Sequence, residues 1–236
     1  MSTERNRTRF SSILESLRAA LSLIRHGHAG EVIRELRRRL YSTRRSYCLL
    51  RDLSVEFPSP QAKIAIAVRR LEEEDVPAIL DVSRRQTGSD RSARMRRLRL
   101  IEYGIPTCYV AVTSDGTPCY LQWLMGHEQN ERIRTFFGGE YPRLDRNEML
   151  LENAFTAESF RGMRIMPCAM SRIAEKANQS HADRVITFVD EANIPSLKGC
   201  ERAGFVPYLL RTERSRFFRR SFEIERLPEG TAYPFD

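Results

Sequence analysis

Hydrophobic residues near the N-terminus recur at helical spacing in two short stretches. Residues 11–25 carry apolar side chains three or four positions apart, and residues 32–40 repeat the pattern after Gly27 and Gly30. We expect an amphipathic helical hairpin that buries its apolar side against the rest of the chain, a partner or a second copy. The apolar stripes consist of Ile13, Leu14, Leu17, Ala20, Leu21, Ile24, Val32, Ile33, Leu36 and Leu40.

The outer face of this hairpin is rich in arginine. Arginines stand at 34, 37, 38 and 39, a pattern that suits either a docked structural extension or an arm that binds nucleic acid. Further on, Tyr47–Ser54 is apolar enough for an edge strand. Phe57–Pro60 is typical of a linker, because proline fits neither a helix interior nor a strand ladder. We therefore divide the chain into an N-terminal hairpin with its linker, residues 1–60, and a main domain, residues 61–236.

The main domain alternates strand-like and helix-like patterns. Residues 63–71 predict a strand, and the acidic run Glu72–Asp75 precedes a helix. Residues 90–102 predict a basic helix around the candidate core residues Met95, Leu98 and Ile101. Residues 108–125 predict a hairpin about a Ser-Asp-Gly turn. A strand, a helix, a strand, a helix and two further strands follow, which indicates an α/β fold.

Cysteines and histidines are too scattered to indicate a site. The odd number of cysteines and the lack of a Cys-x-x-Cys pair argue against a disulfide framework, and we expect a cytoplasmic protein. No run of eighteen apolar residues occurs and the first ten residues are polar, so we expect a soluble chain without a membrane partner. Histidines occur at 26, 28, 127 and 181, without metal-ligand spacing, and we predict no metal.

Two segments in the second half of the chain are the most informative. In the first, a strand that ends near Phe155 is followed by the turn Arg161-Gly162 and by a helix, whose first N–H groups are free to face an anion. In the second, the strand Arg184–Val189 leads into a short helix that stops at Gly204. Both segments have the form of a strand, a turn and a helix.

Together these segments resemble the acyl-CoA site of the GNAT acyltransferase superfamily, over roughly residues 63–226. The resemblance implies a mixed central sheet flanked by helices, in which a central pair of strands splits around acetyl-CoA, with the N-terminal helical extension outside it. It also implies the identity of the residues that bind the cofactor. These are Phe155, Thr156, Arg161, Gly162, Met163, Arg164, Ile165, Met166, Pro167, Asn193 and Ser196.

The first motif departs from the family pattern. In the family an arginine or glutamine is followed by glycines at the third and fifth positions after it, whereas here Arg161 is followed by Arg164 and Met166. Glycine lets the backbone approach a phosphate, and a side chain obstructs that approach. The run is similar to a variant in GNAT members linked to polysaccharide biosynthesis. The charge of Arg164 could offset the loss of glycine at the diphosphate.

The second motif keeps the family spacing. Asn193, Ser196, Gly204 and Phe205 match the Asn-x-x-Ala/Ser to Gly-Phe pattern. Gly204 is also explained without a cofactor, as a left-handed residue that ends a helix. The pair of motifs therefore supports the fold more strongly than it supports the cofactor.

Acyl transfer requires a base and a polarised thioester carbonyl. The resemblance implies that backbone N–H groups around residues 153–156 supply the carbonyl contact. Glu152 and Glu148 are candidate bases on the same face of one strand, and Glu152 is preferred. Either could equally be a solvated carboxylate. The family position for a tyrosine that protonates the leaving thiolate is Cys200, either a catalytic thiol or a small packing residue, and Tyr208 is another candidate donor.

The chain is strongly basic. Its formal net charge is +8 and its sequence pI is about 9.6, with 36 Arg but only three Lys, at 63, 176 and 198. The arginine bias reflects either phosphate recognition or GC-rich coding. In both cases the positive field favours anionic partners such as a CoA diphosphate, nucleotide sugars, acidic glycans or RNA.

The acceptor is the least determined part of the function. In this fold it would lie beside the first two helices and the hairpin, and the candidate lining residues are Arg84, Arg85, Arg91, Gln122, Trp123 and His127. We expect transfer of an acetyl or short acyl group to a small amine, for which an acidic amino sugar is one example. The alternatives are a GNAT domain that binds CoA without turnover, and a protein directed at tRNA or another nucleic acid. A homodimer through the hairpin is compatible with each of them.

Overall fold

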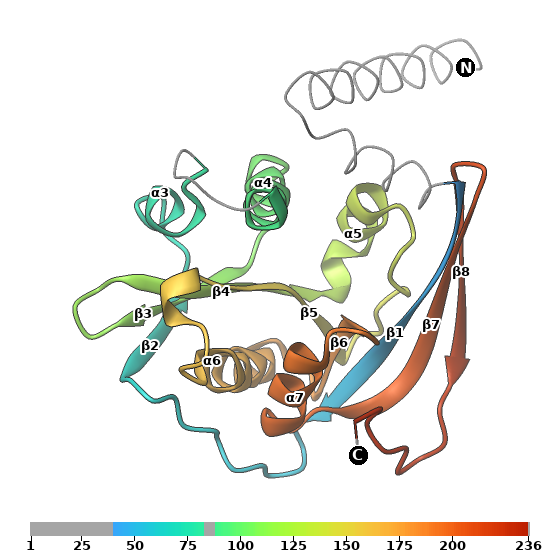
Figure 1. Cartoon of the computed structure of the whole chain (residues 1–236). Helices are drawn as coiled ribbons and strands as arrows, with labels where there is room; N and C mark the ends of the chain where they lie inside the picture. Colours follow the sequence, from blue (N-terminus) through green and yellow to red (C-terminus); the bar gives the residue numbers. More distant parts are fainter. Residues whose placement is uncertain (1–39, 83–87, 236) are drawn as a thin grey trace, which may run out of the picture. The chain divides into compact units, whose positions relative to one another are not determined.

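Eight strands form one mixed sheet in the order β2-β3-β4-β5-β6-β1-β7-β8 (Figure 1). The computed structural model describes residues 40–82 and 88–235. The predicted N-terminal hairpin lies outside these residues apart from Leu40, as do Arg84 and Arg85. The strands are β1 Tyr41–Asp52, β2 Ile66–Arg70, β3 Cys108–Thr113, β4 Pro118–Gly126, β5 Glu148–Thr156, β6 Arg184–Asp190, β7 Val206–Arg216 and β8 Arg219–Arg226.

Helices connect the strands of the central part of the sheet. The α-helices are α3 Asp75–Leu80, α4 Gly88–Glu102, α5 Asn130–Phe137, α6 Ile165–Ala174 and α7 Ile194–Arg202. Three short 3-10 segments, His127–Gln129, Glu158–Phe160 and Glu175–Ser180, precede α5, precede the α6 turn and follow α6. The predicted order of strands after residue 63 is therefore confirmed, as is that of the helices apart from α5. The sequence pattern missed α5.

The chain divides into two units by its internal contacts. The larger unit comprises residues 45–211 and 224–236, and the smaller comprises residues 1–44 and 212–223. The larger unit contains the two apolar clusters described below and all of the motif residues. The proposed domain boundary between residues 60 and 61 remains a prediction.

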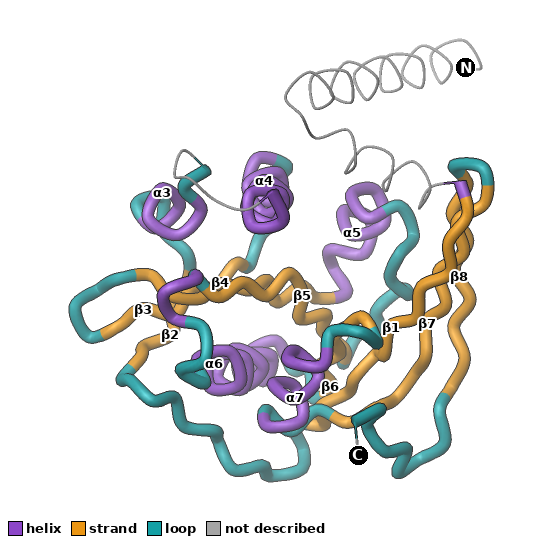
Figure 2. Tube along the Cα trace, in the orientation of Figure 1, coloured by secondary structure: helices purple, strands orange, loops and turns teal. Residues whose placement is uncertain are grey.

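Helices cover both faces of the sheet in the larger unit (Figure 2), and the buried side chains between helices and sheet form two apolar layers. On one face, residues of α6 and α7 pack on side chains such as Leu151 and Tyr120. On the other face, residues of α3, α4 and α5 pack on side chains such as Leu150 and Trp123. Because neighbouring residues of a strand point to opposite faces, β5 contributes Leu150 to one layer and Leu151 to the other. The result is the mixed α/β fold that the sequence predicted.

The prediction of an edge strand at residues 47–54 is wrong. β1 pairs antiparallel with β6, from Ser46 opposite Asp190 to Asp52 opposite Arg184, and β7 lies on its other side. Its neighbours Cys48 and Leu49 are both fully buried, in opposite apolar layers. A strand that is buried on both faces suits the interior of a sheet, and a short apolar run does not indicate which strands will flank it.

Candidate active site

The central strands β5 and β6 form a fork. They pair in parallel only at Glu148, Met149 and Leu150, opposite Arg184, Val185 and Ile186. Beyond Leu150 the two strands no longer pair, while β5 continues along β4 to Thr156. The split of the central strand pair is therefore present at the predicted place.

A β-bulge in β5 lies at this fork. Leu121 of β4 is opposite Phe155 and Trp123 is opposite Glu152, so two β5 residues, Asn153 and Ala154, face one residue of β4. Asn153 has a φ of 61°, in the left-handed region. A bulge turns backbone groups out of the ladder, which leaves peptide groups of β5 available to a ligand or a side chain.

The carboxylate of Glu152 bridges the two arms of the fork. Its Oε1 accepts a hydrogen bond from the N–H of Phe188 on β6 at 2.6 Å, and its Oε2 accepts one from the N–H of Asn153 at 3.3 Å. Glu152 is only 8% exposed. Burial raises the pKa of its carboxyl to about 7, although the two N–H groups and the charge of Arg211 act in the opposite direction. A carboxyl with such a pKa can take up a proton near neutral pH.

Glu148, the second candidate base, lies at the closed end of the fork. It pairs with Arg184 in the part where β5 and β6 are still hydrogen-bonded. Burial raises the pKa of its carboxyl as well, and Arg184 lowers it. Strand alternation could not separate the two glutamates, whereas their positions along the fork do. Glu152 is at the opening.

The predicted cradle forms the start of α6. Gly162 has a φ of 79° with open space around the position of a Cβ, and Arg164, at the N-cap of α6, has a φ of 55°. The first N–H groups of a helix have no acceptor within it, and Pro167 lacks an N–H, so Ile165 and Met166 offer the donors of this first turn. An anion fits such an end of a helix.

Arg161 is held by acidic side chains beside this cradle. Its Nη2 lies 2.9 Å from Asp90 of α4 and 3.7 Å from Glu158, and its Nε donates to the carbonyl oxygen of Thr156 at 3.4 Å. The side chain is half exposed. To contact a diphosphate, the guanidinium would have to break at least one of these contacts with Asp90, Glu158 and Thr156.

Met166 and Gly199 are matched in size across α6 and α7. A Cβ on Gly199 would lie 3.0 Å from the sulfur of Met166. The side chain that replaces a family glycine is therefore accommodated by a glycine on the opposite helix. At the start of α7, the side chain of Asn193 accepts from the N–H of Ser196 at 3.3 Å and so acts as an N-cap.

The end of α7 follows the prediction made for Gly204. Gly204 has a φ of 81°, its N–H donates to Glu201, and the N–H of Phe205 donates to Cys200. These two bonds make a Schellman motif, in which a left-handed residue ends the helix. A Cβ on Gly204 would lie 2.7 Å from the ring of Phe57. The expected left-handed end of α7 is confirmed, with an additional packing reason for glycine.

No known protein-family profile matches the chain, and no curated protein sequence is similar enough to match. Solved structures are similar. A GCN5-related glucosamine N-acetyltransferase region of a fungal multi-domain beta-N-acetylglucosaminidase is 15% identical, with a TM-score of 0.53 over 77% of this chain and 21% of that one. The chain has the GNAT fold.

Two further GNAT proteins are similar at lower TM-scores. An acetyltransferase from Colwellia psychrerythraea is 13% identical over 72% of this chain and 55% of that one, with a TM-score of 0.49. A GCN5-related N-acetyltransferase from Sphaerobacter thermophilus is 15% identical over 78% and 56%, with a TM-score of 0.45. This chain spans about half the length of these two and about a fifth of the fungal enzyme. The structural neighbours are thus N-acetyltransferases of the GNAT type, at identities that show the fold alone.

Cys200 stands where the GNAT resemblance places a tyrosine. The Cys200 side chain is fully buried and its sulfur lies 3.8 Å from that of Met170 in α6. Burial raises the pKa of the thiol. These contacts favour the packing interpretation. Tyr208, the other candidate donor, lies under the guanidinium groups of Arg184 and Arg226, whose carbons are 5.2 Å and 5.5 Å from the centre of its ring.

Two arginines of α4 contact the end of β5, and neither was identified as a functional residue from the sequence. Arg94 is 6% exposed, ion-pairs with Glu158 and lies 4.9 Å from the ring centre of Phe155. Arg97 donates to the carbonyl oxygens of Asn153, at 3.0 Å, and Ala154, and lies 5.0 Å from the same ring. Burial lowers the pKa of Arg97 to about 10. The guanidinium of Arg97 thus supports the carbonyl groups of the bulge.

This arrangement corrects the predicted face of α4. Met95, a predicted core residue, is 40% exposed, whereas Leu100 is fully buried. The hydrophobic pattern assigned the arginines to the solvent side. Arg94 is buried instead, with its Nη1 donating to the carbonyl oxygen of Ile79 and its Nη2 to the carboxylate of Glu158. A sequence signal was present in the three-residue spacing of Arg91, Arg94 and Arg97, but their partners are distant in sequence.

The candidate acceptor residues are not gathered in one place. Trp123 is fully buried in an apolar layer and donates to the carbonyl oxygen of Ile105 at 3.2 Å, while Gln122 is 1% exposed and bonded to Tyr120. Arg91 is exposed on α4, and His127 is 45% exposed beside Glu128. Trp123 and Gln122 therefore belong to the core and do not line an open acceptor site.

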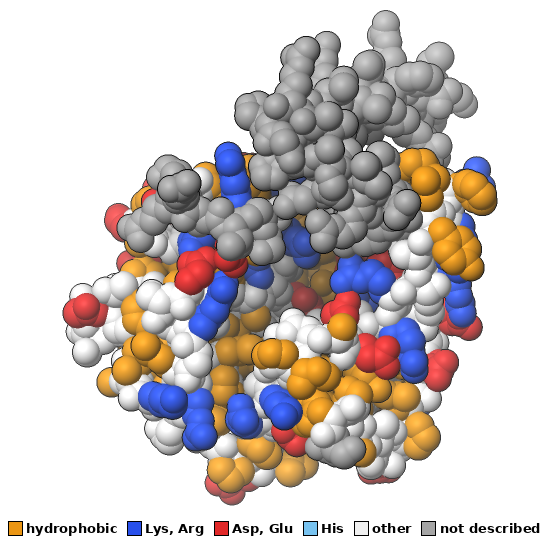
Figure 3. Space-filling view, in the orientation of Figure 1, with side chains coloured by type: hydrophobic (Ala, Val, Ile, Leu, Met, Phe, Trp, Pro, Cys, Tyr) orange, Lys and Arg blue, Asp and Glu red, His pale blue; other side chains and the backbone are white. Residues whose placement is uncertain are grey.

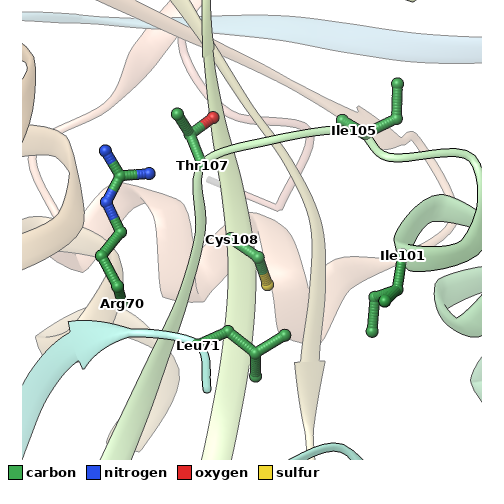
Figure 4. Close-up of a pocket in the computed structure, with 6 residues that line it drawn as sticks. All are labelled: Arg70, Leu71, Ile101, Ile105, Thr107 and Cys108. Atoms are coloured by element: carbon green, nitrogen blue, oxygen red, sulfur yellow. The ribbon is translucent and has the colours of Figure 1, made fainter. Parts of the chain in front are cut away.

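An open cavity lies to one side of the fork (Figure 4). It has a volume of about 350 Å³ and is lined by Arg70, Leu71, Ile101, Ile105, Thr107 and Cys108. Cys108 is opposite Trp123, which in turn is opposite Glu152, so the cavity is two strands away from the candidate base. Since Trp123 lies between them, we do not assign the cavity to the fork.

Two further kinds of feature are absent from residues 40–82 and 88–235. Within that part of the chain, no group of three or more His, Cys, Asp and Glu side chains is placed to hold a metal ion. Its helices are also too short or too polar to cross a membrane. All five cysteines are buried and none forms a disulfide.

Proposed function

We propose that this chain transfers an acetyl or another short acyl group from acyl-CoA to an amine. The observation that carries the proposal is the fork between β5 and β6, with the buried Glu152 at its opening and the first turn of α6 beside the end of β5. A fork supplies unpaired peptide groups, and Glu152 supplies a carboxyl with a pKa of about 7. Few places in a sheet combine the two.

Each group has a role in this proposal. The N–H groups of Ile165 and Met166, with Gly162 before them, hold the diphosphate, while Phe155 and Thr156 lie along the arm that leads to the thioester. The N–H of Ala154 in the β5 bulge polarises the thioester carbonyl, since that of Asn153 donates to Glu152. Asn193 and Ser196, at the start of α7, flank the pantetheine arm.

The reaction needs one proton acceptor. The amine nitrogen attacks the carbonyl carbon, the carbon–sulfur bond breaks, and the proton lost by nitrogen passes to Glu152, directly or through water. The thiolate leaves and takes a proton from solvent. Cys200 has no role in this scheme because its thiol is buried against Met170.

The acceptor is proposed as a small amine, and amino sugars are the first class to test. Its binding side is proposed as the face of the sheet that carries α3 and α4, where Arg91 is an exposed cation. A carboxylate or phosphate on the acceptor would be attracted there.

Calorimetric titration with acetyl-CoA tests the cradle. Gly162→Pro should abolish binding, because proline removes an N–H and cannot adopt the φ of 79° at this position. The matched control is Gly139→Pro, since Gly139 has a φ of 80°, equally open surroundings and a position outside the cradle. Equal affinity in the wild type and Gly162→Pro would contradict the cradle. Loss of binding in both variants would indicate a general effect of proline on the fold.

A second function, CoA binding without turnover, is favoured by one feature. Met166 occupies the place of a family glycine and fills the space next to Gly199. Release of free thiol in the presence of an amine panel separates the two functions. A chain that binds acetyl-CoA but releases no thiol with any amine would support the second.

A further inference from the structure

The net positive charge of this chain belongs entirely to one of its two units. Residues 1–44 and 212–223 contain 14 Arg and 6 Glu, which gives +8 and equals the net charge of the whole chain. The larger unit is balanced, with 25 basic and 25 acidic residues. The excess of positive charge therefore belongs to the smaller unit, and the larger unit has a net charge of zero.

The described part of the smaller unit contains a hairpin with an aromatic turn. Phe217 and Phe218 alone connect β7 to β8, and their φ angles are 48° and 64°. Two positive φ angles are typical of a type I′ turn, for which Asn-Gly is preferred. Bulky residues are disfavoured there, so two adjacent phenylalanines are maintained at a cost in local backbone energy.

Both rings are directed to solvent. Phe217 is 80% exposed and Phe218 is 59% exposed. The N–H of Phe217 donates to Leu40 at 2.9 Å, which places Leu40 and the adjacent Tyr41, 41% and 72% exposed, beside the turn. We call these four residues the aromatic tip. Figure 3 shows hydrophobic and basic side chains next to each other around the turn between β7 and β8.

The arginines next to the aromatic tip are mostly engaged. Arg214 pairs with Glu223, and Arg220 lies 3.5 Å from Glu213. Arg216 stacks 3.7 Å from the ring centre of Tyr41 and donates to the carbonyl oxygen of Ser42. The side chain of Arg219, directly after the turn, is exposed and has no hydrogen-bond or ion-pair partner among residues 40–82 and 88–235. The tip is thus apolar at its end and cationic around it.

We infer that the aromatic tip docks on an anionic phospholipid surface, contrary to the expectation from the sequence that the chain has no membrane partner. Exposed aromatic side chains enter the boundary between headgroups and acyl chains, and a net positive unit is attracted to anionic lipid. Binding of single-stranded RNA is less well supported. It would depend on arginines free to contact phosphates, whereas Arg214, Arg216 and Arg220 already have partners in the chain. Insertion of the two phenylalanine rings into a lipid surface requires no individual arginine–phosphate contact, only the attraction between the net positive charge of the unit and anionic lipid.

Vesicle flotation with the full chain tests this inference. The vesicles contain either phosphatidylcholine alone or one part phosphatidylglycerol to two parts phosphatidylcholine. The chain should float with the second kind and not with the first, and added salt should weaken the binding because it screens the charges. The double variant Phe217→Asn, Phe218→Gly should bind roughly tenfold more weakly, since it loses both rings.

The double variant is chosen because it should not unfold. Asn-Gly is the preferred type I′ pair, so its melting temperature should equal or exceed that of the wild type. Arg219→Glu, which leaves the turn unchanged, should also weaken flotation. Val55→Asn is the matched control, because Val55 is an apolar residue of the larger unit that is 63% exposed. It should leave flotation unchanged.

Three results would overturn the inference. One is a wild-type chain that does not float with phosphatidylglycerol vesicles at low salt. Another is a double variant that floats as well as the wild type. The third is binding of a single-stranded RNA oligomer that the double variant loses while vesicles have no effect, which would assign the tip to nucleic acid.

Discussion

The sulfur of Met166 occupies the space in which a side chain at Gly199 would stand, 3.0 Å from the position of its Cβ. At this contact α6 therefore contributes a large side chain, Met166, and α7 contributes a residue without one, Gly199. A methionine replaces the glycine expected near the diphosphate, and a glycine in α7 makes room for it. The departure from the GNAT motif is thus compensated in size at the contact between α6 and α7.

This contact predicts a coupling between two substitutions. Glycine in a helix interior costs about 1 kcal/mol relative to alanine, so Gly199→Ala should stabilise the chain if space allowed. Next to Met166 that gain should be absent. In a Met166→Ala background, Gly199→Ala should raise the free energy of unfolding by about 1 kcal/mol. Urea denaturation of the four proteins measures the coupling, and equal effects of Gly199→Ala in both backgrounds would show that the two residues are independent.

Substitution of Gly204 by alanine should cause a larger loss of stability. Gly204→Ala combines an unfavourable φ of 81° with a Cβ 2.7 Å from the ring of Phe57, so the ring would have to shift. The control Gly139→Ala has nearly the same φ and nothing within 4 Å, so it should cost only about 1 kcal/mol. Gly204→Ala should cost about 1–3 kcal/mol more than this control, by chemical denaturation. Equal losses would mean that the Phe57 contact has no energetic effect.

Glu152 predicts a pH dependence of both activity and stability. As the base of the proposed transfer it acts when ionised, so the rate should rise with pH through an inflection near its pKa of about 7. Glu152→Gln should remove the inflection and lower the rate. A wild-type inflection that persists in Glu152→Gln would assign it to another group.

The stability effect has the opposite sign. Because burial raises the pKa of Glu152 in the folded chain, the folded state binds more protons than the unfolded state between about pH 4.5 and 7. The contribution of Glu152 to stability is therefore present below the unfolded pKa and is lost as pH rises through the folded pKa. The stability of Glu152→Gln relative to the wild type should increase from pH 5 to pH 8. Thermal unfolding across that range provides the measurement, and a constant difference would contradict the burial argument.

The ion pair between Arg161 and Asp90 predicts a gain of affinity. If Arg161 turns from Asp90, 2.9 Å away, to a diphosphate, Asp90→Asn should remove a competitor. Affinity for acetyl-CoA should then rise by up to about fivefold, the range of an exposed ion pair. Calorimetry in an Arg161→Ala background supplies the control, since Asp90→Asn should have no effect there. Weaker binding by Asp90→Asn alone would mean that the pair supports the cradle as it stands.

Local signals in the sequence were sufficient for much of the fold. The hairpin of β3 and β4, the helix α4 and the order of strands after residue 63 follow from hydrophobic periodicity and turn residues. The left-handed end at Gly204 was predicted for the same reason. Each depends on residues only a few positions apart, so the chain carries the information within one short window.

Other features depended on partners that no local pattern contains. The sequence placed β1 at an edge, whereas it lies between β6 and β7, because strand neighbours are chosen across the whole chain. It placed Met95 in the core and Arg94 outside, but Glu158, 64 residues away, compensates the buried charge of Arg94. The charge of Arg94 alone could not predict that it is buried while Met95 is exposed.

For the two candidate bases, too, the sequence supplied one part of the answer and the tertiary structure the other. The sequence by itself determined that Glu148 and Glu152 share a face of one strand, because side chains alternate with a period of two. Only the tertiary structure distinguishes their surroundings, since the fork opens beyond Leu150 and leaves Glu152 to accept the N–H of Phe188. The burial that raises the pKa of Glu152 comes from two strands and the layers that cover them, which meet only in the folded chain.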